Sequence, residues 1–165
     1  MVAIIGSYIY AIKVIGPRVV LNGEVVTRRQ IQCFTAGALI LWIASDWPMH
    51  DIAEEYLYSV HMLQHMMLSY FVPSLILLSI PKWLFDAVFG SGRGYRVIKF
   101  LSRAPVAGLL FNVMVMVAHI PDVVNRSVSN GPLHYSLHIL LIVTSLLMWM
   151  PVCGPEKPFR LQYGG

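Results

Sequence analysis

Residues 54–80 read EEYLYSVHMLQHMMLSYFVPSLILLSI, and this stretch decides the fold. No residue from Tyr56 to Ile80 carries a formal charge, so the stretch is long enough to cross a bilayer as a helix, which takes about 20 apolar residues. His61 and His65 lie four residues apart within it, which places both imidazoles on one face of a helix. Burying two histidines in a membrane is costly, and the pair therefore indicates a function.

The spacing of this pair lets two imidazoles share one metal ion, as in the zinc-binding HExxH helix. The glutamate that acts as general base in that motif is absent, because Met62 follows His61. The stretch is therefore not a metalloprotease site.

The composition identifies an integral membrane protein. The chain has 165 residues, of which 57% are hydrophobic and 12% charged, and its mean hydropathy is +0.66. A soluble domain has about a quarter of its residues charged. The net charge is +4, and the basic residues that produce it lie in short loops between apolar segments. This distribution is explained by orientation in a membrane rather than by nucleic-acid binding. Cys33 and Cys153 are the only cysteines, and two buried thiols are favoured over a disulfide.

The apolar segments predict an all-α, polytopic transmembrane bundle in a single integral membrane domain, residues 1–165. We expect about five spans, at residues 1–15, 31–45, 55–80, 105–120 and 133–150. Gly16-Pro17 is expected to end the first span and Pro151 the last.

Two further features are predicted from prolines, glycines and charge. Pro73 should kink the third span, because it leaves the carbonyl of Ser69 without its usual amide partner. Residues 82–104 should form an amphipathic piece at the membrane interface, broken at residues 90–92, and residues 121–132 should be a link. The four tryptophans lie near segment ends and are interpreted as interfacial anchors.

The distribution of charge predicts the orientation. Eleven of the twelve lysines and arginines, all except Arg126, fall on one side if the loops after the first and third spans and the C-terminal tail are cytoplasmic. Five of the eight acidic residues fall on the other side. The positive-inside rule then places the N-terminus outside and the C-terminus of this chain inside.

On this map all six histidines gather in the outer half of the protein. Five of them come from three spans and suit a metal ion held between helices: His61, His65, His119, His134 and His138. Imidazole suits copper, zinc and iron, and thioethers select Cu(I). Several methionines lie in the same region (Met49, Met62, Met66, Met67), and copper is therefore the favoured metal.

Each of these residues also has a structural interpretation. A single membrane histidine often only hydrogen-bonds a neighbouring helix. His50 lies in a loop, where histidines are usually solvated, and methionines commonly fill gaps in a core. The acids Asp51, Glu54 and Glu55 are explained by the helix dipole at the start of the third span.

The string AEEYLYSVHMLQH at residues 53–65 resembles the CtaG family of membrane-integral bacterial assembly factors for cytochrome c oxidase. Three later motifs resemble the same family in order and spacing: His119-Ile120-Pro121, LHYSLH at residues 133–138, and Trp149-Met150-Pro151-Val152. Family members often have an aromatic residue before the His-x-Pro motif, where this chain has Ala118. Members are usually longer, so we expect this chain to be a truncated form.

The resemblance implies a role in copper supply or insertion at the outer face of the bacterial cytoplasmic membrane, with oxidase subunits as partners and the five histidines as metal ligands. This would be a binding and transfer protein, not an enzyme. The alternative is a haem-binding electron carrier that uses the same histidines as axial ligands. A di-iron membrane enzyme, a purely structural subunit and a homo-oligomer also remain open.

Overall fold

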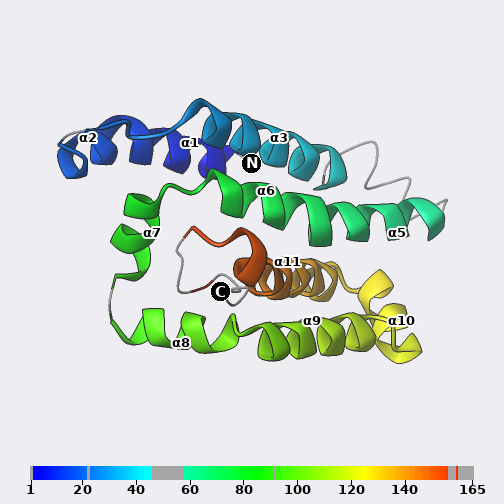
Figure 1. Cartoon of the computed structure of the whole chain (residues 1–165). Coiled ribbons are helices and arrows are strands. Elements are labelled where there is room, and N and C mark those ends of the chain that lie inside the picture. The colour runs from blue at the N-terminus through cyan, green and yellow to red at the C-terminus, as the bar shows by residue number, and fades with distance from the viewer. Residues whose placement is uncertain (1, 22, 46–57, 91, 156–158, 160–165) are drawn as a thin grey trace.

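Helices are the only regular structure in residues 2–21, 23–45, 58–90, 92–155 and 159, which are the residues that the computed structural model describes (Figure 1). This confirms the all-α prediction for that part of the chain. The elements are α1 (Val2–Tyr10), the π-helical turn η1 (Ala11–Ile15), α2 (Gly16–Val19), α3 (Arg28–Ser45), α5 (Tyr58–Met66), the π-helical turn η2 (Met67–Phe71), α6 (Val72–Ser79), α7 (Lys82–Phe89), α8 (Arg93–Leu101), α9 (Ala104–Ala118), α10 (Pro121–Ser129) and α11 (Gly131–Cys153).

Three helical segments are long and apolar enough to cross a membrane: Val2–Val19, Ser59–Ser79 and Gly131–Cys153. Helices α8 and α9 give a fourth if they act as one span with a bend of 74°. Helix α3 is 18 residues long, but it begins with the polar residues Arg28-Arg29-Gln30, which lower its mean hydropathy. The polytopic membrane bundle is thus supported, and the number of five spans stays a prediction.

The long helices lie side by side in the order α3, α6, α11, α9, with α1 beyond α3 (Figure 1). Gly37 allows the close approach of α3 to α6, since a Cβ atom there would lie 3.2 Å from Cβ of Leu75. Tyr8 of α1 stacks on Phe34 of α3 at 3.7 Å between ring centroids. The Tyr8 hydroxyl donates a hydrogen bond of 2.9 Å to the Ser79 carbonyl. Small and aromatic residues therefore fix these contacts.

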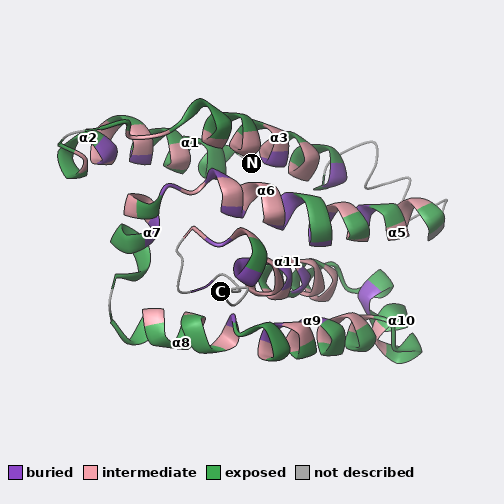
Figure 2. Cartoon of the chain, in the orientation of Figure 1, coloured by how far each residue is buried: buried purple, intermediate pink, exposed green. Residues whose placement is uncertain are grey.

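Two groups of buried apolar residues lie inside this row of helices (Figure 2). One group joins α6, α7 and the end of α11, through Leu77, Phe85 and Met150. The other joins α3 to η2 and α6, through Ala44, Leu68 and Val72. Many other large apolar side chains are exposed, as expected for helices that face lipid.

The expectation that Gly16-Pro17 ends the first segment is wrong, because the helix continues to Val19. The π-helical turn η1 precedes the proline, and the Gly16 N–H donates a hydrogen bond to the Ala11 carbonyl, five residues earlier. This wider turn accommodates the proline ring and its missing donor. The same arrangement recurs at Pro73, where η2 precedes the proline and the Val72 N–H bonds the Met67 carbonyl.

The Ser69 carbonyl, predicted to lose its amide partner to Pro73, accepts a hydrogen bond from another helix. The indole Nε1 of Trp149 on α11 donates to it at 3.0 Å. Trp83 likewise donates to the Val25 carbonyl at 2.8 Å. These two tryptophans therefore tie segments of the protein together, and their interpretation as interfacial anchors misses this role.

Of three further predictions about the connections, one is confirmed and two differ from the structure. Residues 82–104 form two helices that meet near Gly90, whose φ of +53° favours glycine, so the predicted break is confirmed. The predicted link at residues 121–132 contains helix α10, which begins with Pro121 in its first turn. The expectation that Pro151 ends the last span is wrong, because Pro151 lies inside α11, which ends at Cys153. The N–H of Gly154 then donates a hydrogen bond to the Met150 carbonyl at 2.8 Å.

Candidate metal centre

Two helices each present a pair of histidines one turn apart. On α5 the rings of His61 and His65 lie 4.4 Å apart between centroids, and on α11 those of His134 and His138 lie 4.5 Å apart. Both pairs have the i, i+4 spacing that places side chains on one helical face. Each helix thus carries two imidazoles that point the same way.

The packing of α5 and α11 brings the two pairs together. The rings of His65 and His138 lie 5.0 Å apart, and His61 lies 6.2 Å from both His134 and His138. His119, at the C-terminal end of α9, lies 6.3 Å from His65. All five histidines predicted from the sequence therefore fall in one group, to which α5, α9 and α11 contribute.

The group differs in burial from one member to the next. The Nε2 atoms of His65, His134 and His138 are buried. Among the described residues, none hydrogen-bonds Nε2 of His65. A buried polar atom without a partner is costly and indicates a missing ligand or water. His119 is exposed, and its Nδ1 lies 2.7 Å from the Val115 carbonyl.

No three His, Cys, Asp or Glu side chains of the described residues already converge in a geometry that would hold a metal ion. Imidazole nitrogens bind a metal at about 2.0–2.1 Å. Ring centroids between 4.4 and 6.3 Å apart are close enough for shared ligation after rotation of the side chains. Rotation of the side chains would be needed before these imidazole nitrogens could share an ion.

Gln64 also contributes to this arrangement, although it was not among the predicted site residues. Its side chain is fully buried, and its amide Nε2 donates to the Ala44 carbonyl at 2.5 Å. This bond attaches α5 to the last turn of α3. Because Gln64 faces α3, the neighbouring histidines face α11. A polar residue within an apolar span was the available signal.

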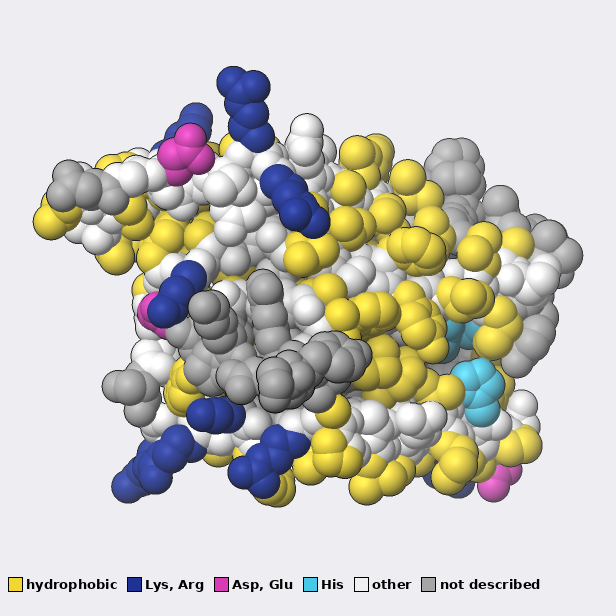
Figure 3. Space-filling model, in the orientation of Figure 1, with side chains coloured by type: hydrophobic (Ala, Val, Ile, Leu, Met, Phe, Trp, Pro, Cys, Tyr) yellow, Lys and Arg dark blue, Asp and Glu magenta, His cyan; other side chains and the backbone are white. Residues whose placement is uncertain are grey.

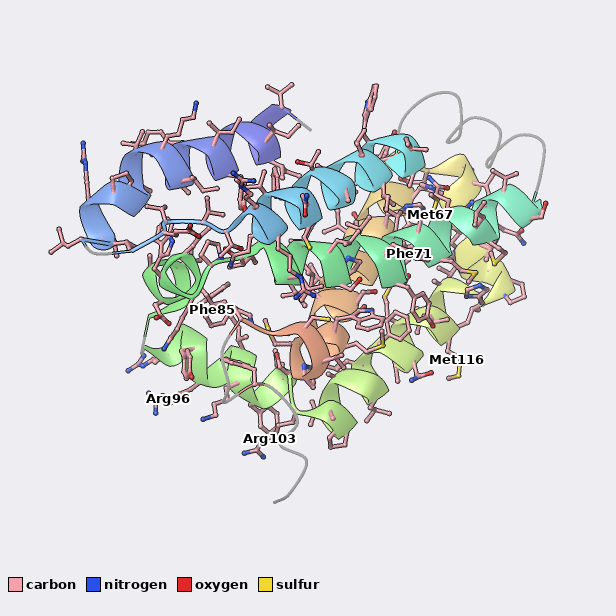
Figure 4. All side chains as sticks on the ribbon, turned by 45° about the horizontal axis from the view of Figure 1, so that its top comes forward. Met67, Phe71, Phe85, Arg96, Arg103 and Met116 are labelled. Atoms are coloured by element: carbon pink, nitrogen blue, oxygen red, sulfur yellow. The ribbon has the colours of Figure 1, made fainter. Side chains whose placement is uncertain are left out.

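The methionines differ in their positions. Met66 and Met116 are 54% and 71% exposed, and Met116 points outward from α9 (Figure 4). Met62, Met67 and Met114 are half-buried. The exposed thioethers face away from the bundle, as expected for side chains in contact with lipid.

Several sequence predictions lie outside the described residues. They concern His50 as a ligand, Met49 as a neighbouring thioether, and the acidic residues at the start of the third span (Asp51, Glu54, Glu55).

Cys33 and Cys153 are unbridged and half-buried, as favoured from the sequence.

Charge is distributed unevenly along the bundle. The histidines lie toward the end formed by α5, α10 and the start of α11, whereas most lysines and arginines lie toward the end formed by α2, α7 and α8 (Figure 3). Arg96 and Arg103 are seen at this second end (Figure 4). The histidine group and the basic residues therefore occupy opposite ends of the helices.

A family model described as cytochrome c oxidase caa3 assembly factor (Caa3_CtaG) matches residues 6–165. The match covers nearly the whole chain and confirms the resemblance noted from the motifs. The searches of curated proteins and of solved structures found no match.

Proposed function

The chain belongs to the family of cytochrome c oxidase caa3 assembly factors, and from this premise we propose that it holds copper for delivery to the oxidase. The proposed ligands are His61, His65, His119, His134 and His138. The protein would act by binding and transfer rather than by catalysis, with oxidase subunits and the bilayer as its partners.

One observation carries the proposal: the histidine pairs of α5 and α11 face each other, with His65 and His138 5.0 Å apart. Intramembrane ionisable residues generally serve a function, because their burial is costly. A role limited to hydrogen bonding would satisfy the buried Nε2 of His65, yet none of the described residues does so. A metal ion would satisfy it.

Copper is favoured by the chemistry of the donors. Neutral imidazole binds copper, zinc and iron, and the half-buried thioether of Met62, next to His61, would add preference for Cu(I). The copper ion is the cargo of the protein and not a catalyst. The histidines bind it, and the helices orient the histidines.

The proposed site lies near the outer face of the bacterial cytoplasmic membrane. Basic residues gather at the opposite end of the helices, and the positive-inside rule assigns that end to the cytoplasm (Figure 3). Helix α3 runs back along α6 (Figure 1). If α3 crosses the membrane, the first and third predicted spans both run inward. The N-terminus would then be outside and the C-terminus of this chain inside, with five spans in one domain.

The proposal is tested by metal analysis and an absorbance scan of the purified chain after loading with Cu(I). The variants are His61→Ala/His65→Ala and His134→Ala/His138→Ala, and Met66→Ala is the matched control from the exposed face of α5. We expect both double variants to lose most of the copper, about 10-fold or more in affinity. The control should retain it.

Three results would contradict the proposal in different ways. A wild type that holds no more copper than the His61→Ala/His65→Ala variant would remove the site altogether. An unchanged copper content in the His134→Ala/His138→Ala variant would mean that α5 alone provides the ligands. A Soret band in the wild type that disappears in the variants would identify haem as the ligand, with the same histidines as axial ligands.

A further inference from the structure

His119 differs from the other histidines of the group in its exposure. It lies at the C-terminal end of α9 and is exposed, whereas the Nε2 atoms of His65, His134 and His138 are buried. An ion arriving from outside the bundle would therefore reach the His119 ring before it reached those three buried nitrogens. The order in which ligands contact the ion would follow from burial alone.

The hydrogen bond of His119 determines which ring nitrogen is available. Nδ1 lies 2.7 Å from the Val115 carbonyl, one turn back on α9. A carbonyl only accepts, so Nδ1 carries the proton and Nε2 carries the lone pair. Bonds of this kind fix the tautomer and orientation of metal-binding histidines. The ring of His119 is thus held ready to bind through Nε2.

The distance to His65 allows one ion to be shared. A metal bound to an imidazole nitrogen lies roughly 3.2 Å from the centre of the ring, given bond lengths of about 2.0 Å. The rings of His65 and His119 are 6.3 Å apart. This spacing is about twice the distance from a ring centre to a bound metal, and it matches one ion shared by the two rings.

We propose that His119 is the exchange ligand of the copper site, through which Cu(I) enters and leaves, and that His65 and His138 hold the resident ion. This inference rests on the proposed function. On entry, the bond from Cu(I) to its external donor breaks as a bond to Nε2 of His119 forms. A bond to His65 then replaces the bond to His119. The ion stays Cu(I) throughout, so the exchange needs no oxidant or reductant.

The experiment measures how fast Cu(I) leaves the full chain. The protein is placed in phosphatidylcholine nanodiscs and loaded with Cu(I), and the ion is captured by bathocuproine disulfonate, a charged chelator that does not enter the membrane. We expect His119→Ala, which lacks one of the five proposed ligands, to hold more copper at saturation than His65→Ala and to release it roughly tenfold more slowly than the wild type. His119→Met should restore the rate, because an exposed thioether also binds Cu(I).

The controls separate this inference from the proposed function. Met116→Ala removes another exposed side chain of the last turns of α9 and should leave the rate unchanged. An unchanged release rate in His119→Ala would overturn the inference while leaving the copper site intact. A loss of bound copper in His119→Ala as large as in His65→Ala would also overturn it, since His119 would then be a resident ligand. If the wild type and His65→Ala both hold no copper, the proposed function itself fails.

Discussion

Replacing Trp149 with phenylalanine should destabilise the bundle by removing the indole N–H that bonds the Ser69 carbonyl. The bond is 3.0 Å long, and Ser69 is 3% exposed, so water has little access to the residue. An acceptor left unsatisfied in a buried site costs about 1–3 kcal/mol. Hydrogen bonds between membrane helices contribute about 0.6 kcal/mol on average, and this value sets the lower limit of the expected loss of stability.

A double-mutant cycle isolates this contribution. Pro73→Ala restores an amide N–H four residues after Ser69, and this N–H can replace the indole as donor. The cost of Trp149→Phe should therefore be smaller in the Pro73→Ala background, with a coupling of about 0.5–2 kcal/mol. The free energy of unfolding is measured by titration with SDS in mixed micelles, followed by far-UV circular dichroism. Additive costs in the two backgrounds would refute the idea that Trp149 substitutes for the missing amide.

Two further substitutions test the packing of α3. Gly37→Leu places a side chain whose Cβ would lie 3.2 Å from Cβ of Leu75, and it should cost about 1–3 kcal/mol in the same titration. Gly6→Leu is the control, because a Cβ atom at Gly6 would meet nothing within 4 Å, and it should cost far less. Equal costs would contradict the close approach of α3 and α6. Gln64→Leu removes the donor to the Ala44 carbonyl and should cost about 1–3 kcal/mol. It should also lower copper retention, and retention at the wild-type level would show that this bond does not orient the histidines.

The sequence was sufficient to predict the long helices and the grouping of the histidines. The apolar runs set the helix positions, because a bilayer demands about 20 apolar residues with internal hydrogen bonds. The asymmetry of basic residues then placed both histidine pairs at one end of the bundle. The spacing within each pair fixed the shared face on α5 and on α11.

Other features depend on tertiary contacts that no local pattern records. Pro17 looks like a helix terminus, yet a π-helical turn carries the helix past it. The partner of the Ser69 carbonyl lies 80 residues away, at Trp149. The side chain of Gln64 marks the face of α5 that contacts α3, because it donates a hydrogen bond to the Ala44 carbonyl. Such pairings arise from helix packing and become visible only in three dimensions.

The π-helical turn η2 has a consequence for helix phase. It lies between His65 and Pro73 and takes up one residue more than an α-helical turn would. Each residue of an α-helix turns the chain by about 100°. A continuous α-helix with the same number of residues would keep the packing of α6 against α3 and α11 but turn His61 and His65 by about 100° around the axis, away from the α11 pair. The wider turn therefore keeps both histidines on the face of α5 that lies toward α11.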